Sequence, residues 1–343
     1  MNMHKNHGLC LLILLAGLGQ TLLAAPLRVA AATPDLADLT LQVGGDEVAV
    51  FSFVKGSEDP HFLEARPSLV KQLSQADLLI VNGMELEVGW LPVLQKNARN
   101  AAVLPGAPGY LDASKSIIPL DVPTGQVDRS MGDVHAAGNP HYLLDPVNGW
   151  LVARSIAERL VALRPALRET TAQRVLAFEE QLAKRLLGPA PLTKQPGAFW
   201  LTALVGKRLA EALQSTGLAA DQVTGWLGAV RPIAGLAVVG DHDLWPYFAR
   251  RFGIVPVAFL EPKPGIQPSS RHLTELAEKM RQEHWRVILS AAFFPASHAR
   301  LVAEKTGAKI ANMAHQTGSR PPCTSYLEMV DYNVTALLDA AQP

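Results

Sequence analysis

Cysteine is the scarcest residue type in this sequence. The 343 residues include only two cysteines, Cys10 and Cys323. Cys10 lies in an apolar N-terminal segment that we expect to be removed, so the mature chain cannot form an internal disulfide. Its fold must therefore depend on a hydrophobic core, and a chain of this length that is 48% hydrophobic is large enough to build one.

The sequence also lacks a net charge. Lys and Arg together number 31, and Asp and Glu together also number 31. This balance argues against a general electrostatic attraction to nucleic acid or to an anionic membrane surface. We therefore expect no nucleic-acid partner, and we expect any ligand to be recognised at a local site.

Long apolar runs are absent after the N-terminus. The run at residues 9–25 follows Lys5 and ends in small residues, a pattern typical of a secretory signal peptide cleaved between Ala24 and Pro26. A retained membrane anchor is the alternative, but the run is shorter than the ~20 residues of a bilayer span and contains glycines. We predict a signal peptide over residues 1–25 and a periplasmic mature protein.

Short apolar runs alternate with helical patterns along the rest of the chain, in two series. Such alternation predicts α/β lobes with parallel-type sheets. The expected strands are residues 27–32, 48–54, 76–83, 236–240, 255–259, 286–289 and 309–311.

One long amphipathic segment separates the two series. Arg168–Leu187 has no glycine or proline and carries apolar residues at helical spacing, and a Gly-Pro-Ala-Pro cluster follows it. We predict an N-terminal α/β lobe over 26–164, an interlobe helix over 165–188 and a C-terminal α/β lobe over 189–343.

Four histidines stand where an expected strand gives way to a loop or helix. They are His61 in "GSEDPH", His141 in "GNPH", His242 in "VVGDHDLW" and His315 in "KIANMAHQTG". The carboxyl ends of parallel strands line the crevice in which ligands bind, so the four side chains can converge. Proline stiffens the turns before His61 and His141, which suits a metal ligand. The simpler interpretation is a set of exposed or hydrogen-bonded loop histidines.

Polar residues precede three of these histidines. Asp59, Asn139 and Asp241 can cap the helices that follow, or they can orient an imidazole that binds metal. His135 lies in a glycine-rich loop shortly before His141. It is either an ordinary loop residue or, with Asp133, a transient metal contact.

Several phrases resemble one family, the periplasmic zinc and manganese substrate-binding proteins of ABC importers, known as cluster A-I. They are "GSEDPHFLEARPSLVKQLSQADLLIVNGMELE", "GNPHYLLDP", "GDHDLWPYFARRFGI", "FLEPKPGIQPS" and "KTGAKIA" leading to "SYLEMVDYNV". The resemblance implies two lobes joined by a rigid helix, with metal bound in the interlobe cleft. It places ligands at His61, His141 and His242.

The fourth ligand position departs from the family pattern. Many relatives have an aspartate there, and the best match in this chain is His315. Imidazole nitrogen suits zinc whereas manganese prefers oxygen, so we expect Zn²⁺ rather than Mn²⁺ as the bound ion. Water, Glu58, Asp243 or Glu261 are the alternatives for this position. The stretch 192–222 is longer than usual in the family, and we expect an extra helix there.

The function that follows is capture of Zn²⁺, free or delivered by a periplasmic metallochaperone. The ion would pass to an inner-membrane ABC permease and its ATPase, and the protein would act as a monomer and not as an enzyme. The alternatives are a binding protein for manganese, another divalent metal or an organic ligand, a metal-dependent adhesin, and a zinc hydrolase. A hydrolase would need a general base beside a zinc-bound water, but the chain has no His-Glu-x-x-His spacing.

Overall fold

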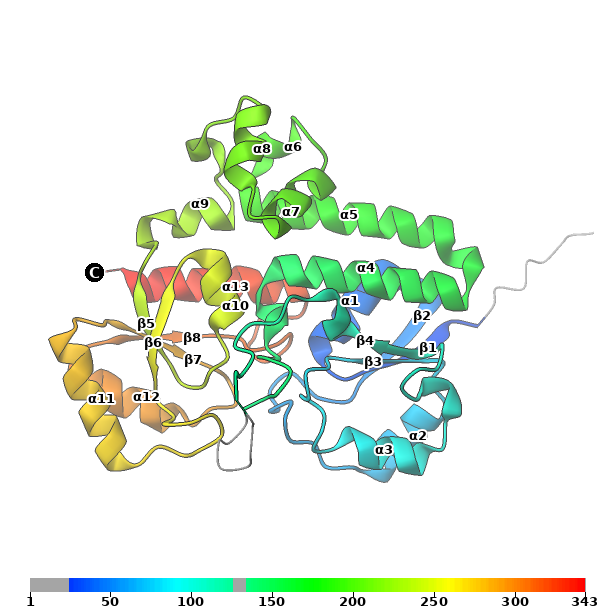
Figure 1. Ribbon diagram of the computed structural model, residues 1–343, viewed down its shortest axis with the longest axis horizontal. Coiled ribbons are helices and arrows are strands. Elements are labelled where there is room, and N and C mark those ends of the chain that lie inside the picture. The colour runs from blue at the N-terminus through cyan, green and yellow to red at the C-terminus, as the bar shows by residue number, and fades with distance from the viewer. Residues whose placement is uncertain (1–24, 126–133, 343) are drawn as a thin grey trace, which may run out of the picture.

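Two four-stranded parallel sheets, one in each half of the chain, form the framework of this computed structural model, which describes residues 25–125 and 134–342 (Figure 1). The first sheet has the order β2-β1-β3-β4 and the second the order β6-β5-β7-β8. Both sheets therefore place the first strand of their series between the second and the third. The predicted α/β fold of two lobes with parallel sheets is confirmed. The strands are β1 (Leu27–Ala31), β2 (Val48–Ser52), β3 (Leu78–Val81), β4 (Tyr110–Asp112), β5 (Ala237–Gly240), β6 (Val255–Phe259), β7 (Val287–Ser290) and β8 (Lys309–Asn312).

Helices cover both faces of each sheet (Figure 1). The first sheet has α1 and α4 on one face and α2 and α3 on the other, and the second has α10 and α13 on one face and α11 and α12 on the other. Helix α3 and strand β4 were not predicted. The helices are α1 (Pro34–Gly44), α2 (Pro67–Ser74), α3 (Leu91–Ala98), α4 (Pro146–Leu163), α10 (Pro246–Phe252), α11 (Ser270–Gln282), α12 (Ala296–Thr306) and α13 (Tyr326–Ala341).

Helix α5 (Arg168–Leu187) joins the lobes and lies alongside α4 (Figure 1). Its bounds are those predicted for the amphipathic segment, and it ends at Gly188, whose φ of 83° suits glycine. The Trp150 indole N–H donates a 2.8 Å hydrogen bond to the buried Glu179 carboxylate and so ties α4 to α5. The boundaries of the lobes at 164 and 189 stay predictions.

The segment after α5 contains more than the single extra helix expected for residues 192–222. That expectation was wrong, because Pro196 and Gly206 bound one short helix and separate it from its neighbours. Trp200, which is fully buried, belongs to the short helix that packs on α5. The helices here are α6 (Pro189–Leu192), α7 (Gly197–Val205), α8 (Leu209–Ser215) and α9 (Trp226–Val230).

One continuous hydrophobic core serves both lobes. It includes Val29 and Leu79 from the first sheet and Val238 and Leu289 from the second, together with side chains of α4, α5 and α13. A smaller cluster, which includes Met280, lies between the second sheet and α11 and α12. The shared core holds the two sheets in a defined relation to each other, which a site between the lobes requires.

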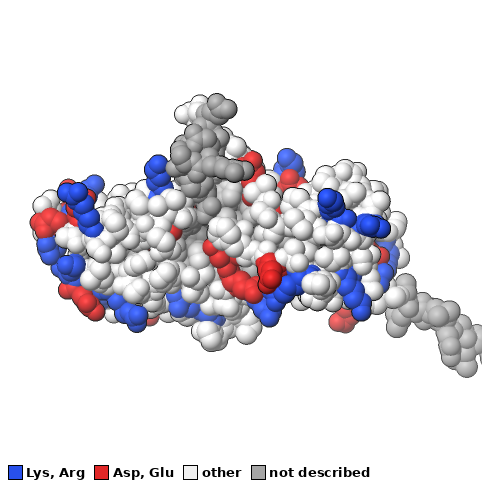
Figure 2. Space-filling model, turned by 90° about the horizontal axis from the view of Figure 1, so that it is seen from below, with Lys and Arg blue, Asp and Glu red and all other residues white. Residues whose placement is uncertain are grey.

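The predicted signal peptide lies almost wholly outside the described residues, which begin at 25. Within the described ranges, none of the helices has both the length and the apolar character needed to cross a bilayer. Seen from below, the molecule carries a group of acidic side chains near its middle, and much of the remaining surface is uncharged (Figure 2).

Candidate metal centre

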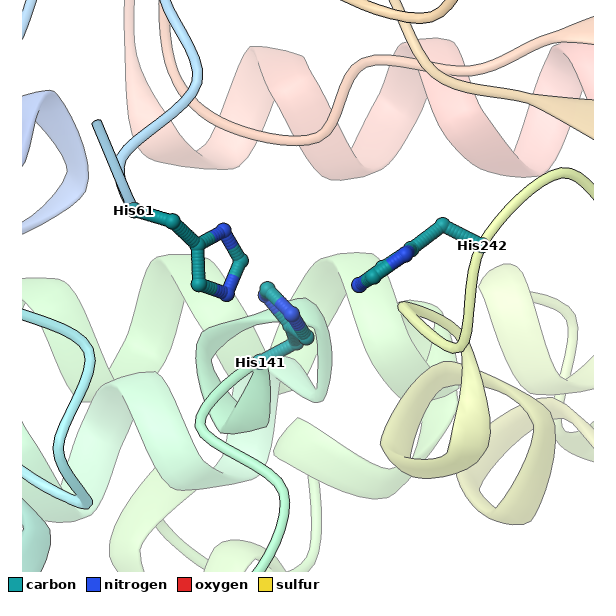
Figure 3. A group of neighbouring side chains, drawn as sticks. All are labelled: His61, His141 and His242. Carbon is teal, nitrogen blue, oxygen red and sulfur yellow. The ribbon is translucent and has the colours of Figure 1, made fainter. Parts of the chain in front are cut away.

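Three of the four predicted histidines meet between the lobes, with their rings pointing toward one another (Figure 3). The ring centroids of His61 and His141 are 5.3 Å apart, and each lies 5.9 Å from the centroid of His242. One nitrogen from each ring lies within 4.8 Å of the others. His61 and His141 come from loops of the first lobe, and His242 follows β5 of the second. The trio can therefore hold one ion only while both lobes are in place.

The turn before His61 orients its imidazole. The Asp59 carboxylate accepts bonds from the backbone N–H of His61 at 3.0 Å and from its Nδ1 at 2.8 Å. A carboxylate oxygen in this role accepts, so the ring proton sits on Nδ1 and the lone pair on Nε2. Nε2 is buried and has no hydrogen-bond partner in the described part of the chain. Burial alone would raise the pKa of Asp59, but the hydrogen bond and charge of His61 lower it.

Glu261 plays the same part for His242. Its carboxylate lies 2.6 Å from Nδ1 of His242 and also accepts the Gly265 backbone N–H at 2.8 Å. Nε2 of His242 is therefore the nitrogen left for an ion. Burial favours a lower pKa for His242, but the hydrogen bond and charge of Glu261, together with the charges of Asp241 and Asp243, raise it. An acidic partner outside a ligating histidine is the arrangement common at zinc sites.

His141 sits on the second stiffened turn. The Asn139 side chain accepts the His141 backbone N–H at 3.0 Å and donates to the Asp243 carbonyl at 2.8 Å, which links the two lobes beside the trio. Burial, followed by the neighbouring His61 and His242, holds the pKa of His141 well below its usual range. His141 is therefore neutral at physiological pH, which is the form that binds metal.

His315 lies outside the trio. Its Nε2 is 3.1 Å from the Glu58 carbonyl oxygen, which can only accept, so the lone pair is on Nδ1. That Nδ1 is buried and has no partner among the residues described. The ring packs on Phe293 at 4.8 Å, and burial lowers its pKa to about 4. Its assignment as fourth ligand stays a prediction.

His135 is a neighbour of the trio. From the sequence it was predicted only as a loop residue or a transient metal contact. Its ring stacks on that of His61 at 5.3 Å, and its Nε2 is buried with no partner within the described ranges. Burial, with His61 and His242, lowers its pKa to about 4. It lines a cavity of about 50 Å³ with His141, His242 and Asp243. Asp133, its suggested companion, lies outside the described residues.

The carboxylates considered as a hydrolytic base have other surroundings. Glu261 is bound to His242, and the Glu58 carboxylate accepts the Lys55 backbone N–H at 2.9 Å. Burial and the nearby Asp121 raise the pKa of Asp243 to about 6. The trio therefore presents three imidazoles that could hold one cation, two of them with a carboxylate behind the ring.

Comparison with known proteins shows similarity to metal-binding components of ABC transporters. A family model described as the periplasmic zinc-uptake complex component A, ZnuA, matches residues 29–185 and 220–340. The manganese ABC transporter substrate-binding lipoprotein PsaA of Streptococcus pneumoniae is 32% identical over 259 residues, which are 75% of this chain and 69% of that protein. The metal ABC transporter substrate-binding lipoprotein FimA of Streptococcus parasanguinis is 33% identical over 161 residues, 46% of this chain and 48% of that one.

Solved structures share the fold. A crystal structure of ZnuA superposes with a TM-score of 0.67 at 20% identity, covering 92% of this chain and all of the other. The laminin-binding protein Lmb of Streptococcus agalactiae, described as having adhesin and metal transporting activity, gives 0.63 at 19% identity, with 92% and 100% covered. The family match leaves out residues 186–219, which contain α6, α7 and α8.

Proposed function

This chain belongs to the family of the periplasmic zinc-uptake complex component A, and we propose that it captures Zn²⁺ in the periplasm and delivers it to an inner-membrane ABC permease. The family consists of substrate-binding components of metal importers and not of enzymes. The observation that carries the proposal is the trio His61, His141 and His242, whose rings converge between the lobes with the lone pairs of His61 and His242 directed away from their acidic partners.

Zinc is the proposed cargo because the trio offers nitrogen alone. Manganese prefers shells rich in oxygen, and it is the metal named for the pneumococcal relative. The carboxylates Asp59 and Glu261 lie behind imidazoles instead of beside the ion, where they raise ligand basicity. Manganese is therefore the second candidate, and the choice between the two metals depends on the fourth ligand.

We assign the fourth position to His315, through Nδ1. The bond from its Nε2–H to the Glu58 carbonyl selects the tautomer in which Nδ1 is free, as Asp59 does for Nε2 of His61. His135 is the rival, since its free Nε2 lies beside His61. Four imidazoles would give a closed tetrahedral shell, which suits binding and release and leaves no site for a reactive water.

Membership of this family supports a proposal for the partners. The protein would act as a monomer, take Zn²⁺ from solution or from a periplasmic metallochaperone, and dock on a permease that is coupled to an ATPase. Hydrolysis is not expected, because a closed shell leaves no open position for a catalytic water. The zinc-loaded protein should therefore show no turnover of ester or amide substrates.

Metal titration of the chelator-stripped mature protein tests the proposal. One tight zinc site is expected, with weaker manganese binding. Replacing His61, His141 or His242 individually by Ala should weaken zinc affinity by more than the ~10–100-fold caused by loss of an outer partner. His284→Asn is the matched control, because His284 is exposed and asparagine tolerates its φ of 56°. Unchanged zinc affinity in all three alanine variants would contradict the assignment.

Two further variants decide the fourth position. His315→Ala should weaken zinc and leave a three-nitrogen shell completed by water, while His135→Ala should leave the equilibrium affinity near that of the wild type. The opposite result would transfer the fourth position to His135. X-ray absorption at the zinc edge counts the nitrogen ligands in each case.

A further inference from the structure

Residues 314–318, which we call the Gln316 loop, follow β8 of the second sheet and reach the turn that carries His61. The buried Gln316 amide nitrogen lies 3.1 Å from the carbonyl oxygen of Lys55, 3.2 Å from that of Gly56 and 2.9 Å from that of Glu58. One side chain of the second lobe therefore contacts three acceptors of a first-lobe turn.

The neighbours of Gln316 strengthen this contact. The Thr317 backbone N–H and hydroxyl both donate to one oxygen of the buried Asp35 carboxylate, each at 2.6 Å. Asp35 stands in the first turn of α1, so the bond joins the loop to the first lobe a second time.

The backbones of the two loops also touch. A Cβ built on Gly56 would lie 2.2 Å from the Gly318 carbonyl carbon, so only glycine fits at this position. The Gln316 loop is therefore packed against the first lobe by side-chain bonds and by direct backbone contact.

The turn that Gln316 contacts carries the proposed metal ligand His61. Glu58, whose carbonyl receives the Gln316 bond, is followed directly by Asp59, which orients His61 through two hydrogen bonds. On the other side of His61, the Pro60 carbonyl accepts a 3.0 Å bond from the Trp90 indole. A metal ligand must be held within about 0.5 Å of its productive position. The Gln316 loop contributes to that constraint from the opposite lobe.

We propose that Gln316 is a positioning residue for metal binding: by holding the Lys55–Glu58 carbonyls it sets where His61 stands relative to His242. This rests on the proposed function of the histidine trio. These contacts join the two lobes on the His61 side of the centre. Gln316 has no role as a ligand; it acts through His61.

A double-mutant cycle on zinc affinity tests the inference. Gln316→Met keeps the length of the side chain and removes the amide, so it should raise the zinc Kd by about tenfold, the lower end for an outer partner. The same substitution in a His61→Ala background should change the Kd by less than about twofold, because the ligand it positions is gone. Gln282→Met, the same chemical change on the exposed surface of α11, is the control and should leave the Kd unchanged.

The possible results distinguish a failure of the positioning role of Gln316 from a failure of the proposed metal site. If Gln316→Met weakens zinc equally with and without His61, or leaves the Kd near that of the wild type, the positioning role is overturned. If His61→Ala itself leaves zinc affinity unchanged, it is the proposed metal site that fails. If Gln316→Met does not fold, Thr317→Val replaces it in the cycle, since it removes one bond to Asp35 and keeps the backbone bond. The absorption spectrum of Co²⁺ bound at the site is a second measurement, and it should stay unchanged if Gln316 has a purely structural role.

Discussion

Replacing Glu261 by Gln removes the negative charge behind His242 with little change in shape. The carboxylate lies 2.6 Å from Nδ1 of His242, and the two side chains are 4% and 6% exposed. Solvent therefore screens the pair poorly, and the charge both orients the imidazole and raises its pKa above the usual value.

The substitution has two opposing effects on zinc binding. At pH 8, loss of the outer partner should weaken zinc by about 10–100-fold, or about 1.4–2.7 kcal/mol. In the wild type, zinc must displace a proton from His242 once the pH falls below the raised pKa, and the apparent affinity then drops by about tenfold per pH unit. Without Glu261 the pKa falls, so this competition begins at lower pH. The two affinities should approach each other in acid.

Competition titrations with a zinc chelator at pH 8, 7 and 6 measure both effects. The ratio of the Kd of Glu261→Gln to that of the wild type should be largest at pH 8 and should shrink toward pH 6. Glu304→Gln, an exposed position on α12, should give a ratio of one throughout. A Glu261→Gln protein with wild-type affinity and wild-type pH dependence would refute the role given to this pair.

Three further predictions concern stability and selectivity. Burial raises the pKa of Asp35 to about 7 in the folded chain, whereas the unfolded chain releases this proton near 3.8. The protonated Asp35 side chain therefore contributes stability in acid, and this contribution is lost as the pH rises through 7. The free energy of unfolding of Asp35→Asn, measured in urea, should rise by up to about 4 kcal/mol relative to that of the wild type between pH 4 and pH 8. Arg251→Leu leaves the fully buried Asp145 without its bidentate partner at 2.7 and 2.9 Å and should cost about 3–5 kcal/mol of unfolding free energy. His315→Asp should raise the affinity for Mn²⁺ relative to Zn²⁺, measured by competition between the two metals.

Matched controls accompany the two stability predictions. Asp46→Asn and Arg300→Leu change exposed side chains and should alter the unfolding free energy by less than about 0.5 kcal/mol. A pH-independent difference for Asp35→Asn, or an Arg251→Leu loss no larger than that of its control, would contradict the electrostatic arguments. An unchanged metal preference in His315→Asp would show that His315 does not face the ion.

The features that the sequence predicted well are local ones. Strand β5 is a short continuous apolar run, helix α5 repeats apolar residues at helical spacing, and a glycine marks the end of each. His61 and His242 follow strands of parallel sheets, whose carboxyl ends face the same crevice. Their convergence therefore follows from the order of strands and loops along the chain.

The features that the sequence did not predict depend on contacts between distant segments. Strand β4 has only three residues, and its pairing with β3 identifies it better than its composition does. The stacking of His135 on His61 depends on how a long loop returns to the site. In the sequence, nothing distinguishes Gln316 from other polar residues. Only the fold places it beside carbonyl groups that lie 258 to 261 positions away.

A crystal structure of the zinc-loaded protein, with anomalous diffraction at the zinc edge, tests the central claim most directly. We predict one strong anomalous peak between the lobes, about 2.0–2.1 Å from Nε2 of His61 and of His242 and from a ring nitrogen of His141. A peak elsewhere in the molecule, or an ion bound mainly by carboxylates with these three histidines uninvolved, would contradict it.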